Sequence, residues 1–217
     1  MKKIVVMLTK FPEAGNVKTR LAKDIGFDKS AQVQEIFIKN LLNNNYFNLD
    51  KKYDFKVCLK ERYKINDFVN KFGVKNEDIF FPIGDDLGSV MSSIFKKTIG
   101  NYEEVLLIGS DIPLLQDIDF KKAFTILENK DFVLGKAIDG GYYLVGMKDL
   151  NTYIFDDIIY STPGVLDETV FKIVNNSNSY GLLIEKRDID ELSDIIEEAK
   201  IDKSGFFKTV ISKINEK

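Results

Sequence analysis

The side chains that could carry chemistry are carboxylates, lysines and arginines, because the 217 residues include no His and a single Cys. This composition excludes Ser–His–Asp and Cys–His catalysis, Cys/His zinc sites and an internal disulfide. Cys58 lies in an alternating apolar segment, Y-D-F-K-V-C-L-K, and is expected to be an ordinary strand residue. The remaining groups favour phosphoryl or glycosyl transfer assisted by Mg²⁺ or Mn²⁺.

A cationic segment at residues 10–21 suggests a phosphate-binding loop and reads K-F-P-E-A-G-N-V-K-T-R-L. It is not a Walker loop, because Pro12 and Val17 stand where G-x-x-x-x-G-K-[ST] requires glycines. Asn16 is a good helix N-cap, which predicts Lys18 and Arg20 in the first helical turn. Cations are unfavourable at that end of a helix, and a bound anion would remove the penalty. A solvated basic turn explains the segment equally well.

Two aspartates follow predicted strands in unusual segments. Asp111 ends the buried run E-V-L-L-I-G-S-D, and Pro113 stops that strand. A carboxylate at a strand end suits one ligand position on Mg²⁺, so we expect Asp111 to bind metal in preference to capping a turn. Asp139 begins D-G-G-Y-Y-L-V-G, which is either a tight glycine turn or an acceptor pocket with Asp139 as base or hydroxyl acceptor.

Three further segments have a structural interpretation beside a functional one. G-D-D-L-G, residues 84–88, is a capped helix start or a place where a base or ribose lies against backbone. R-D-I-D-E-L, residues 187–192, is a strand end and helix cap, or it completes a metal site through Asp188 or Asp190. Tyr160 in Y-S-T-P-G is ambiguous between packing and ligand contact.

These segments belong to a chain in which predicted strands and helices alternate. Ser30 is expected to cap one helix and Gly73 to end another. The alternation predicts one α/β domain over residues 1–217, Rossmann-like, with helices on both faces of a mainly parallel sheet and one antiparallel excursion near D-G-G-Y-Y. Ligands bind beyond the carboxyl ends of such strands, which predicts one shared site. Apolar runs place the strands near residues 2–9, 53–60, 79–83, 104–109, 131–137, 142–147 and 180–185.

The composition is ordinary for a soluble globular protein, with 44% apolar residues, 30% charged residues and a net charge of −3. A chain with this net charge is not attracted as a whole to nucleic acid or to an anionic membrane. No apolar run approaches the roughly 20 residues of a membrane span, and the apolar run at the start is too short for a signal peptide. We therefore expect a cytoplasmic protein without stable membrane insertion. The sequence predicts no particular oligomeric state.

Taken together, the segments resemble a family of small bacterial proteins identified as glycosyltransferases, including the arsenosugar-biosynthesis type. The resemblance covers nearly the whole chain and implies the GT-A fold of the nucleotide-diphospho-sugar transferase superfamily. The chain is also similar to molybdenum-cofactor and 2-phospholactate guanylyltransferases. It departs from the family pattern at Ser89, Val90 and Tyr160. The segments that carry the resemblance are K-F-P-E-A-G-N-V-K-T-R-L, G-D-D-L-G, I-G-S-D-I-P-L-L, D-G-G-Y-Y-L-V-G, S-T-P-G-V and R-D-I-D-E-L.

The resemblance implies that the first loop holds nucleotide phosphates and that Asp111 takes the place of the superfamily's metal-binding Asp. With the segment interpretations above, it predicts catalytic roles for Lys18, Asp111 and Asp139, and a Mg²⁺ or Mn²⁺ ion on Asp111 and Asp190. The predicted acceptor contacts are Gly140, Gly141, Tyr142 and Tyr143. The predicted nucleotide contacts are Lys10, Pro12, Gly15, Val17, Lys18, Arg20, Gly84, Asp86, Gly88 and Ser110.

Three functions are compatible with these residues. The first is transfer of a sugar from a nucleotide-diphosphate donor to a small-molecule acceptor. The second is nucleotidyl transfer, in which an acceptor phosphate attacks an NTP and pyrophosphate leaves. The third is a nucleotide-binding protein without turnover, which would bind its ligand with little dependence on metal. The convergence of Asp111, Asp139 and the cationic loop favours the first two.

Overall fold

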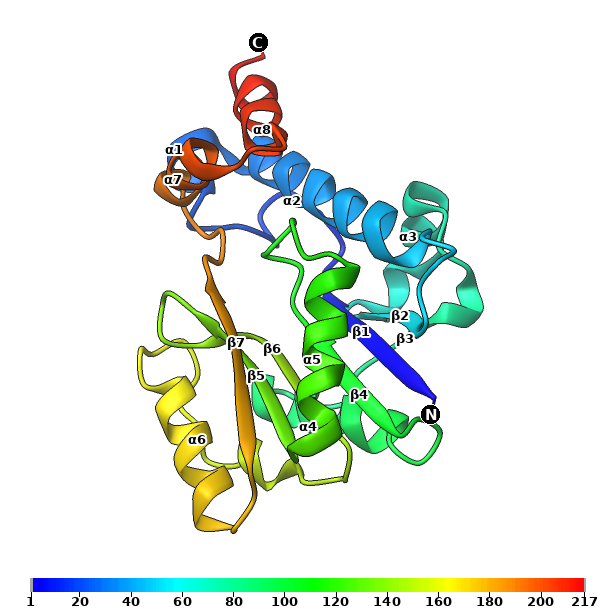
Figure 1. Ribbon diagram of the computed structural model, residues 1–217. Coiled ribbons are helices and arrows are strands. Elements are labelled where there is room, and N and C mark those ends of the chain that lie inside the picture. The colour runs from blue at the N-terminus through cyan, green and yellow to red at the C-terminus, as the bar shows by residue number, and fades with distance from the viewer. Residues whose placement is uncertain (1, 217) are drawn as a thin grey trace.

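The computed structural model describes residues 2–216, and within them lies one seven-stranded sheet with helices on both faces (Figure 1). The strand order is β3-β2-β1-β4-β6-β5-β7. The strands are β1 Lys3–Thr9, β2 Asp54–Leu59, β3 Ile79–Phe80, β4 Glu104–Ile108, β5 Phe132–Ala137, β6 Tyr142–Met147 and β7 Tyr180–Lys186.

The sheet is parallel except at β6. β1 pairs in parallel with β2 and β4, β2 with β3, and β5 with β7, whereas β6 is antiparallel to both β4 and β5. The predicted α/β fold and its antiparallel excursion after D-G-G are therefore confirmed. Because β6 runs backwards, its first residues lie at the same edge of the sheet as the last residues of its neighbours. That edge collects the segment after β4 and the turn before β6.

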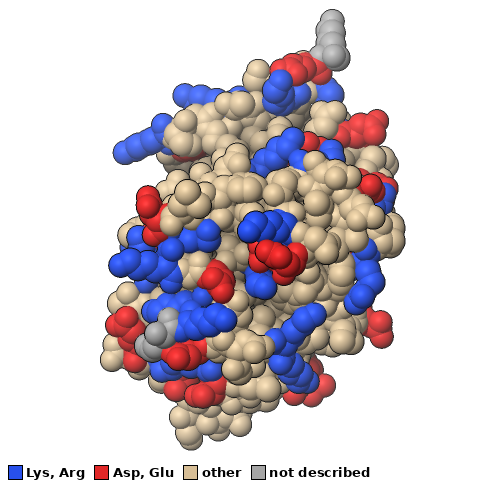
Figure 2. Space-filling model, turned by 90° about the vertical axis from the view of Figure 1, so that its right-hand side faces the viewer, with Lys and Arg blue, Asp and Glu red and all other residues tan. Residues whose placement is uncertain are grey.

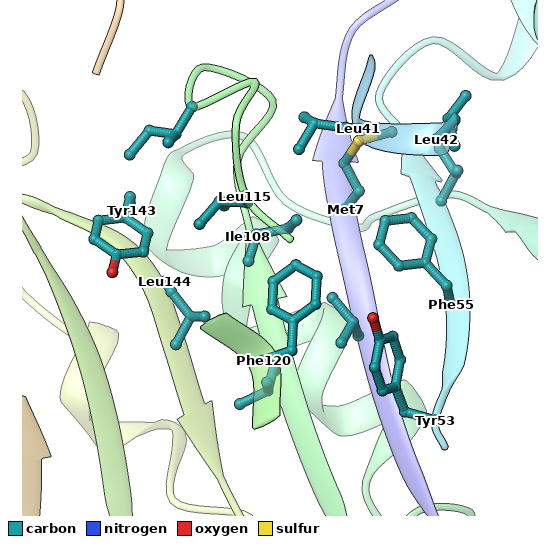
Figure 3. Packing of buried hydrophobic residues seen from close by; sticks show 14 of the residues in the cluster. Met7, Leu41, Leu42, Tyr53, Phe55, Ile108, Leu115, Phe120, Tyr143 and Leu144 are labelled. Atoms are coloured by element: carbon teal, nitrogen blue, oxygen red, sulfur yellow. The ribbon is translucent and has the colours of Figure 1, made fainter. Parts of the chain in front are cut away.

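Helices cover the two faces of the sheet through separate apolar clusters. The α2, α3 and α5 helices pack on the face that receives Val5 and Met7 of β1, and α4 and α6 pack on the face that receives Ile4 and Val6. The first of these clusters is shown in Figure 3, where Met7 and Phe55 face Phe120 of α5. The helices are α1 Ala22–Ile25, α2 Phe27–Leu41, α3 Ile65–Phe72, α4 Leu87–Thr98, α5 Asp117–Asn129, α6 Val165–Asn175, α7 Leu192–Ile201 and α8 Phe206–Asn215.

Four short helical turns complete the elements described within residues 2–216: a π-helical turn over Leu42–Tyr46 and 3₁₀ turns over Arg62–Lys64, Asn76–Asp78 and Thr152–Phe155. A third apolar cluster joins α1, α2, α7 and α8 above the carboxyl ends of the strands (Figure 1). Its centre is Phe37 of α2, and Ile189 packs into it from the segment between β7 and α7. This cluster anchors residues 187–191 beside the first loop.

The charge of the surface is mixed. Figure 2 shows Lys and Arg interspersed with Asp and Glu over one side of the molecule. None of the helices described within residues 2–216 is long and apolar enough to cross a membrane.

Two helix starts differ from the prediction. The segment from Asn16 to Leu21 is a turn, so Lys18 and Arg20 precede the short α1 helix and do not lie in a helical first turn. Lys18 has a φ of 47°, a left-handed conformation that interrupts a right-handed helix. Ser30 lies inside α2, which begins at Phe27, and its hydroxyl donates to the Phe27 carbonyl. Gly73 ends α3 in the left-handed conformation, as predicted.

Candidate active site

A cleft of about 650 Å³ opens at the carboxyl edge of the sheet. Its walls are the first loop, the segment after β4, the turn before β6 and the segment after β7. This is the edge at which the sequence predicts a shared site. The first loop, the segment after β4 and the turn before β6 contribute to it, and G-D-D-L-G contributes Leu87. The polar lining includes Thr9, Lys10, Lys18, Arg20, Gln34, Ser110, Asp111, Asp139, Asp188 and Asp190.

Lys18 links three of these walls. Its ammonium lies 2.5 Å from the Asp111 carboxylate and 3.9 Å from Asp190, and it donates a short hydrogen bond to the Ile189 carbonyl. Its side chain is 3% exposed, whereas those of Asp111 and Asp190 are 46% and 45% exposed. The Ile189 amide also donates to the Asp111 carbonyl at 3.1 Å. The first loop, the β4 end and the β7 end are therefore held together by one cation and one backbone bond.

Four carboxylates and four cations line the cleft, and the carboxylates lie close enough to repel one another around Asp188. Burial and then the neighbouring carboxylates of Asp111, Asp139 and Asp190 together raise the pKa of Asp188 to about 7, against the opposing effect of Lys18. Burial also raises the pKa of Asp190, against the opposing effect of Lys18. The Arg20 guanidinium lies 3.2 Å from Asp190 and is otherwise exposed. Positive charge placed beside Asp188 would relieve the repulsion among these carboxylates.

The carboxylates offer hard oxygen ligands of the kind that Mg²⁺ and Mn²⁺ bind. The pKa of Asp188 is raised first by burial and then by the carboxylates of Asp111, Asp139 and Asp190, so these acidic groups repel one another. Within residues 2–216, however, no three acidic, His or Cys side chains are grouped closely enough to hold one ion. The predicted ligands Asp111 and Asp190 both contact Lys18 in place of a common ion. Their metal-binding role stays a prediction.

The turn before β6 forms another wall of the cleft. The Asp139 carboxylate accepts a 2.9 Å hydrogen bond from the Gly141 amide and remains exposed. Tyr142 and Tyr143 both border the cleft but point to opposite faces of the sheet, as neighbours in a strand do. Tyr143 is buried, and its hydroxyl donates to the Ile184 carbonyl at 3.0 Å. Its hydroxyl is therefore occupied by a contact within the fold, and Asp139 and Gly141 are the more accessible of the predicted acceptor contacts.

One part of the cleft is apolar. It lies toward α4 and α6, where Tyr160 packs against the core while also facing the cleft. Tyr160 therefore combines the two predicted alternatives: it packs against the core, and it borders the cleft where a ligand could contact it. The apolar lining includes Leu8, Leu87, Met91, Leu107, Val145 and Val165.

Several residues predicted to contact the nucleotide do not border the cleft: Pro12, Gly15, Gly84, Asp86 and Gly88. Asp86 caps α4, where its carboxylate accepts from the Ser89 amide at 2.9 Å. A Cβ at Gly84 would lie 2.3 Å from the Ser89 hydroxyl oxygen, and one at Gly88 would lie 2.7 Å from the Phe155 carbonyl. Packing of the chain against itself therefore explains this segment, as the capped-helix interpretation expects.

Gly140 also lies outside the cleft lining, although the sequence predicts an acceptor contact there. Its φ is 90°, and a Cβ would lie 2.1 Å from the Pro163 carbonyl oxygen. We expect Gly140→Ala to destabilise the protein by about 3 kcal/mol, since both the backbone conformation and the contact are incompatible with a side chain. The matched control is Gly15→Ala, at a φ of 84° with nothing within 4 Å, for which about 1 kcal/mol is expected. Urea unfolding of both variants measures the difference, and equal losses would contradict the close approach.

The cleft also contains residues that the sequence interpretation missed. Thr9 and Gln34 border it from the end of β1 and from α2, and Asp188 stood only as an alternative to Asp190. The spacing of Gln34 could have identified it. It lies three and four positions before Phe37 and Ile38, so this polar side chain shares a helix face with two buried apolar ones. Ser161 and Thr162 complete the wall near Tyr160, and Ser161 has a φ of 64°.

The chain matches one protein family and many solved structures. A family described as "Uncharacterized protein conserved in bacteria (DUF2064)" matches residues 75–162. No curated protein matches the chain. A candidate nucleotide-diphospho-sugar transferase from Desulfovibrio desulfuricans G20 is 26% identical with a TM-score of 0.87, and the similarity covers 99% of this chain and 97% of that one.

Two more distant structures share the fold. The inositol-1-phosphate CTP transferase from T. maritima is 13% identical with a TM-score of 0.54, over 100% of this chain and 97% of that one. Rv0371C of Mycobacterium tuberculosis H37Rv, in complex with manganese, is 12% identical with a TM-score of 0.52, over 91% and 97% of the two chains. The fold is therefore that of nucleotidyltransferases and GT-A-like transferases, while the finer resemblance to the arsenosugar type stays a prediction.

Proposed function

We propose that this protein is a transferase that moves a sugar from a nucleotide-diphosphate sugar to a small-molecule acceptor. The observation that carries the proposal is the convergence of Lys18 and Arg20 with Asp111, Asp139 and Asp188 in one cleft at the carboxyl edge of the sheet. The similarity to the Desulfovibrio protein supports the same class of donor.

The described side chains suggest a division of roles. Lys18 and Arg20 would neutralise the diphosphate as it leaves, and Lys18 is held in place by its bonds to Asp111 and Ile189. Asp139, exposed in the turn before β6, would accept the proton of the acceptor hydroxyl. A Mg²⁺ or Mn²⁺ ion, held by Asp111 with Asp188 or Asp190, would supply Lewis-acid stabilisation of the diphosphate.

Nucleotidyl transfer is the second candidate, because the CTP transferase from T. maritima shares the fold over the whole chain. The two reactions differ in their products. Sugar transfer releases a nucleoside diphosphate, whereas nucleotidyl transfer consumes an NTP and releases pyrophosphate. Incubation of the protein with each donor and a mixture of sugar-phosphate and alcohol acceptors, with separate detection of the two products, distinguishes the candidates. Pyrophosphate release without any nucleoside diphosphate would replace the first proposal by the second.

Asp111→Asn provides a mutational test of the site. We expect it to weaken Mn²⁺-dependent nucleotide binding at least about 100-fold, because an amide is a far poorer ligand for a hard cation than a carboxylate. Titration calorimetry with and without Mn²⁺ measures the effect. Asp24→Asn, an exposed position in α1, is the control and should bind like the wild type. Equal affinity of Asp111→Asn and wild type under both conditions would remove Asp111 from the metal site.

A further inference from the structure

The floor of the cleft contains a buried polar group that the proposed roles do not use. It consists of Thr9, Gln34 and Ser110, which are 4%, 4% and 5% exposed. They come from the end of β1, from α2 and from the position before Asp111. All three border the cleft, so the group lies between the core and any bound ligand.

Both donors in this group are directed at the Ser110 hydroxyl oxygen. The Gln34 amide nitrogen donates to it at 2.7 Å. The Thr9 hydroxyl lies 3.0 Å from Ser110 and 3.2 Å from the Lys10 carbonyl, so Ser110 is the nearer acceptor of its one hydrogen. A serine oxygen has two lone pairs and one hydrogen. When both lone pairs accept these bonds, the hydrogen is the part of the Ser110 hydroxyl that is left to bond a ligand.

The Gln34 side chain is not explained by folding alone. Its amide oxygen is buried and has no hydrogen-bond partner in the described chain. A buried acceptor without a partner opposes folding, whereas an apolar side chain of the same size would fill the position without that cost. Apart from Ser30, whose hydroxyl donates to the Phe27 carbonyl, the other buried positions of α2 are apolar, among them Val33, Phe37 and Ile38. The amide therefore points to a role in the cleft.

We propose that Gln34 is a positioning residue which, together with Thr9, holds the Ser110 hydroxyl as a hydrogen-bond donor to an anionic oxygen of the bound nucleotide. The inference rests on the proposed function, since the ligand class is the nucleotide phosphate. The acceptor oxygen lies beside Asp111, because Ser110 precedes that residue directly. Phosphate oxygens accept such charge-assisted bonds strongly.

A double-mutant cycle tests this role. The probes are UDP, GDP, CDP and ADP, each with Mn²⁺, and the dissociation constant is measured by titration calorimetry. We expect Ser110→Ala and Gln34→Met each to weaken binding about tenfold, the size of one hydrogen bond to a charged oxygen. The double variant should also lose only about tenfold, because Gln34 acts through Ser110. Gln32→Met, the same substitution at an exposed position of α2, should bind like the wild type.

Gln34→Glu tests the direction of the hydrogen bond and replaces Gln34→Met if that variant does not fold. Its carboxylate accepts only, so it should draw the Ser110 hydrogen away from the ligand and weaken binding at least as much as Ser110→Ala. Wild-type affinity in the Gln34 variants, or losses that multiply to about 100-fold in the double variant, would overturn the inference alone. A wild type that binds none of the four probes would overturn the proposed function and the inference with it.

Discussion

Lys18→Ala is expected to abolish nucleotide binding and to lower the melting temperature by about 5–10 °C. If the segment were a solvated basic turn, as one interpretation of the sequence has it, removal of Lys18 would leave stability nearly unchanged. The structure reverses that expectation, because the Lys18 side chain is 3% exposed and holds Asp111, Asp190 and the Ile189 carbonyl. Loss of a buried cation leaves its carboxylates uncompensated; for partners that are half exposed, this costs about 2–3 kcal/mol.

The control for Lys18 is Lys23→Ala, an exposed lysine in the adjacent α1 helix. Thermal unfolding followed by circular dichroism should show no change for Lys23→Ala and a clear loss for Lys18→Ala. An unchanged melting temperature in both variants would show that Lys18 does not hold the three walls of the cleft together.

Asp188→Asn is expected to make the protein more stable at pH 8 and to weaken ligand binding. The pKa of Asp188 is raised from 3.8 to about 7 by burial and by its acidic neighbours. The unfolded chain ionises near pH 4, whereas the folded protein keeps this proton until about pH 7. Ionisation of Asp188 therefore lowers stability progressively between pH 4 and pH 7, and the loss is constant above that range.

Asparagine removes that loss, because it carries no charge at any of these pH values. We expect a gain of about 1–2 kcal/mol at pH 8, discounted for solvent screening of the cleft, which corresponds to about 3–6 °C in melting temperature. The gain should disappear near pH 4. Melting curves of wild type and variant from pH 4 to pH 8 measure it, with Asp24→Asn as a control that shows no such trend. A variant less stable than wild type at pH 8 would contradict the electrostatic description of the cleft.

The sequence predicts the architecture well, because each strand is a short apolar run and each helix has its own apolar spacing. The antiparallel β6 was predictable since D-G-G permits a tight turn between two buried strands. The location of the cleft follows from the same argument: segments rich in carboxylates and cations come directly after strands. Local patterns of this kind need no knowledge of contacts between distant residues.

Conformations that depend on distant contacts were not predictable. The first loop forms a turn in place of a helix because Val17 and Leu21 are buried and Lys18 is drawn to Asp111, far along the chain. Glycines at 84, 88 and 140 look alike in sequence whether they approach a ligand or their own chain. In this structure the contact partners are Ser89, Phe155 and Pro163.

The measurement that tests the proposed function most directly is a thermal-shift panel of nucleotide sugars and NTPs, each with Mn²⁺ and with EDTA. A ligand at 100 times its dissociation constant adds about 2.7 kcal/mol, which corresponds to roughly 5–11 °C for a chain of this size. We predict stabilisation by at least one nucleotide sugar with Mn²⁺ and none with EDTA. A panel in which no nucleotide shifts the melting temperature, or in which sulfate shifts it as much as any nucleotide sugar, would contradict the assignment of this cleft to a nucleotide donor.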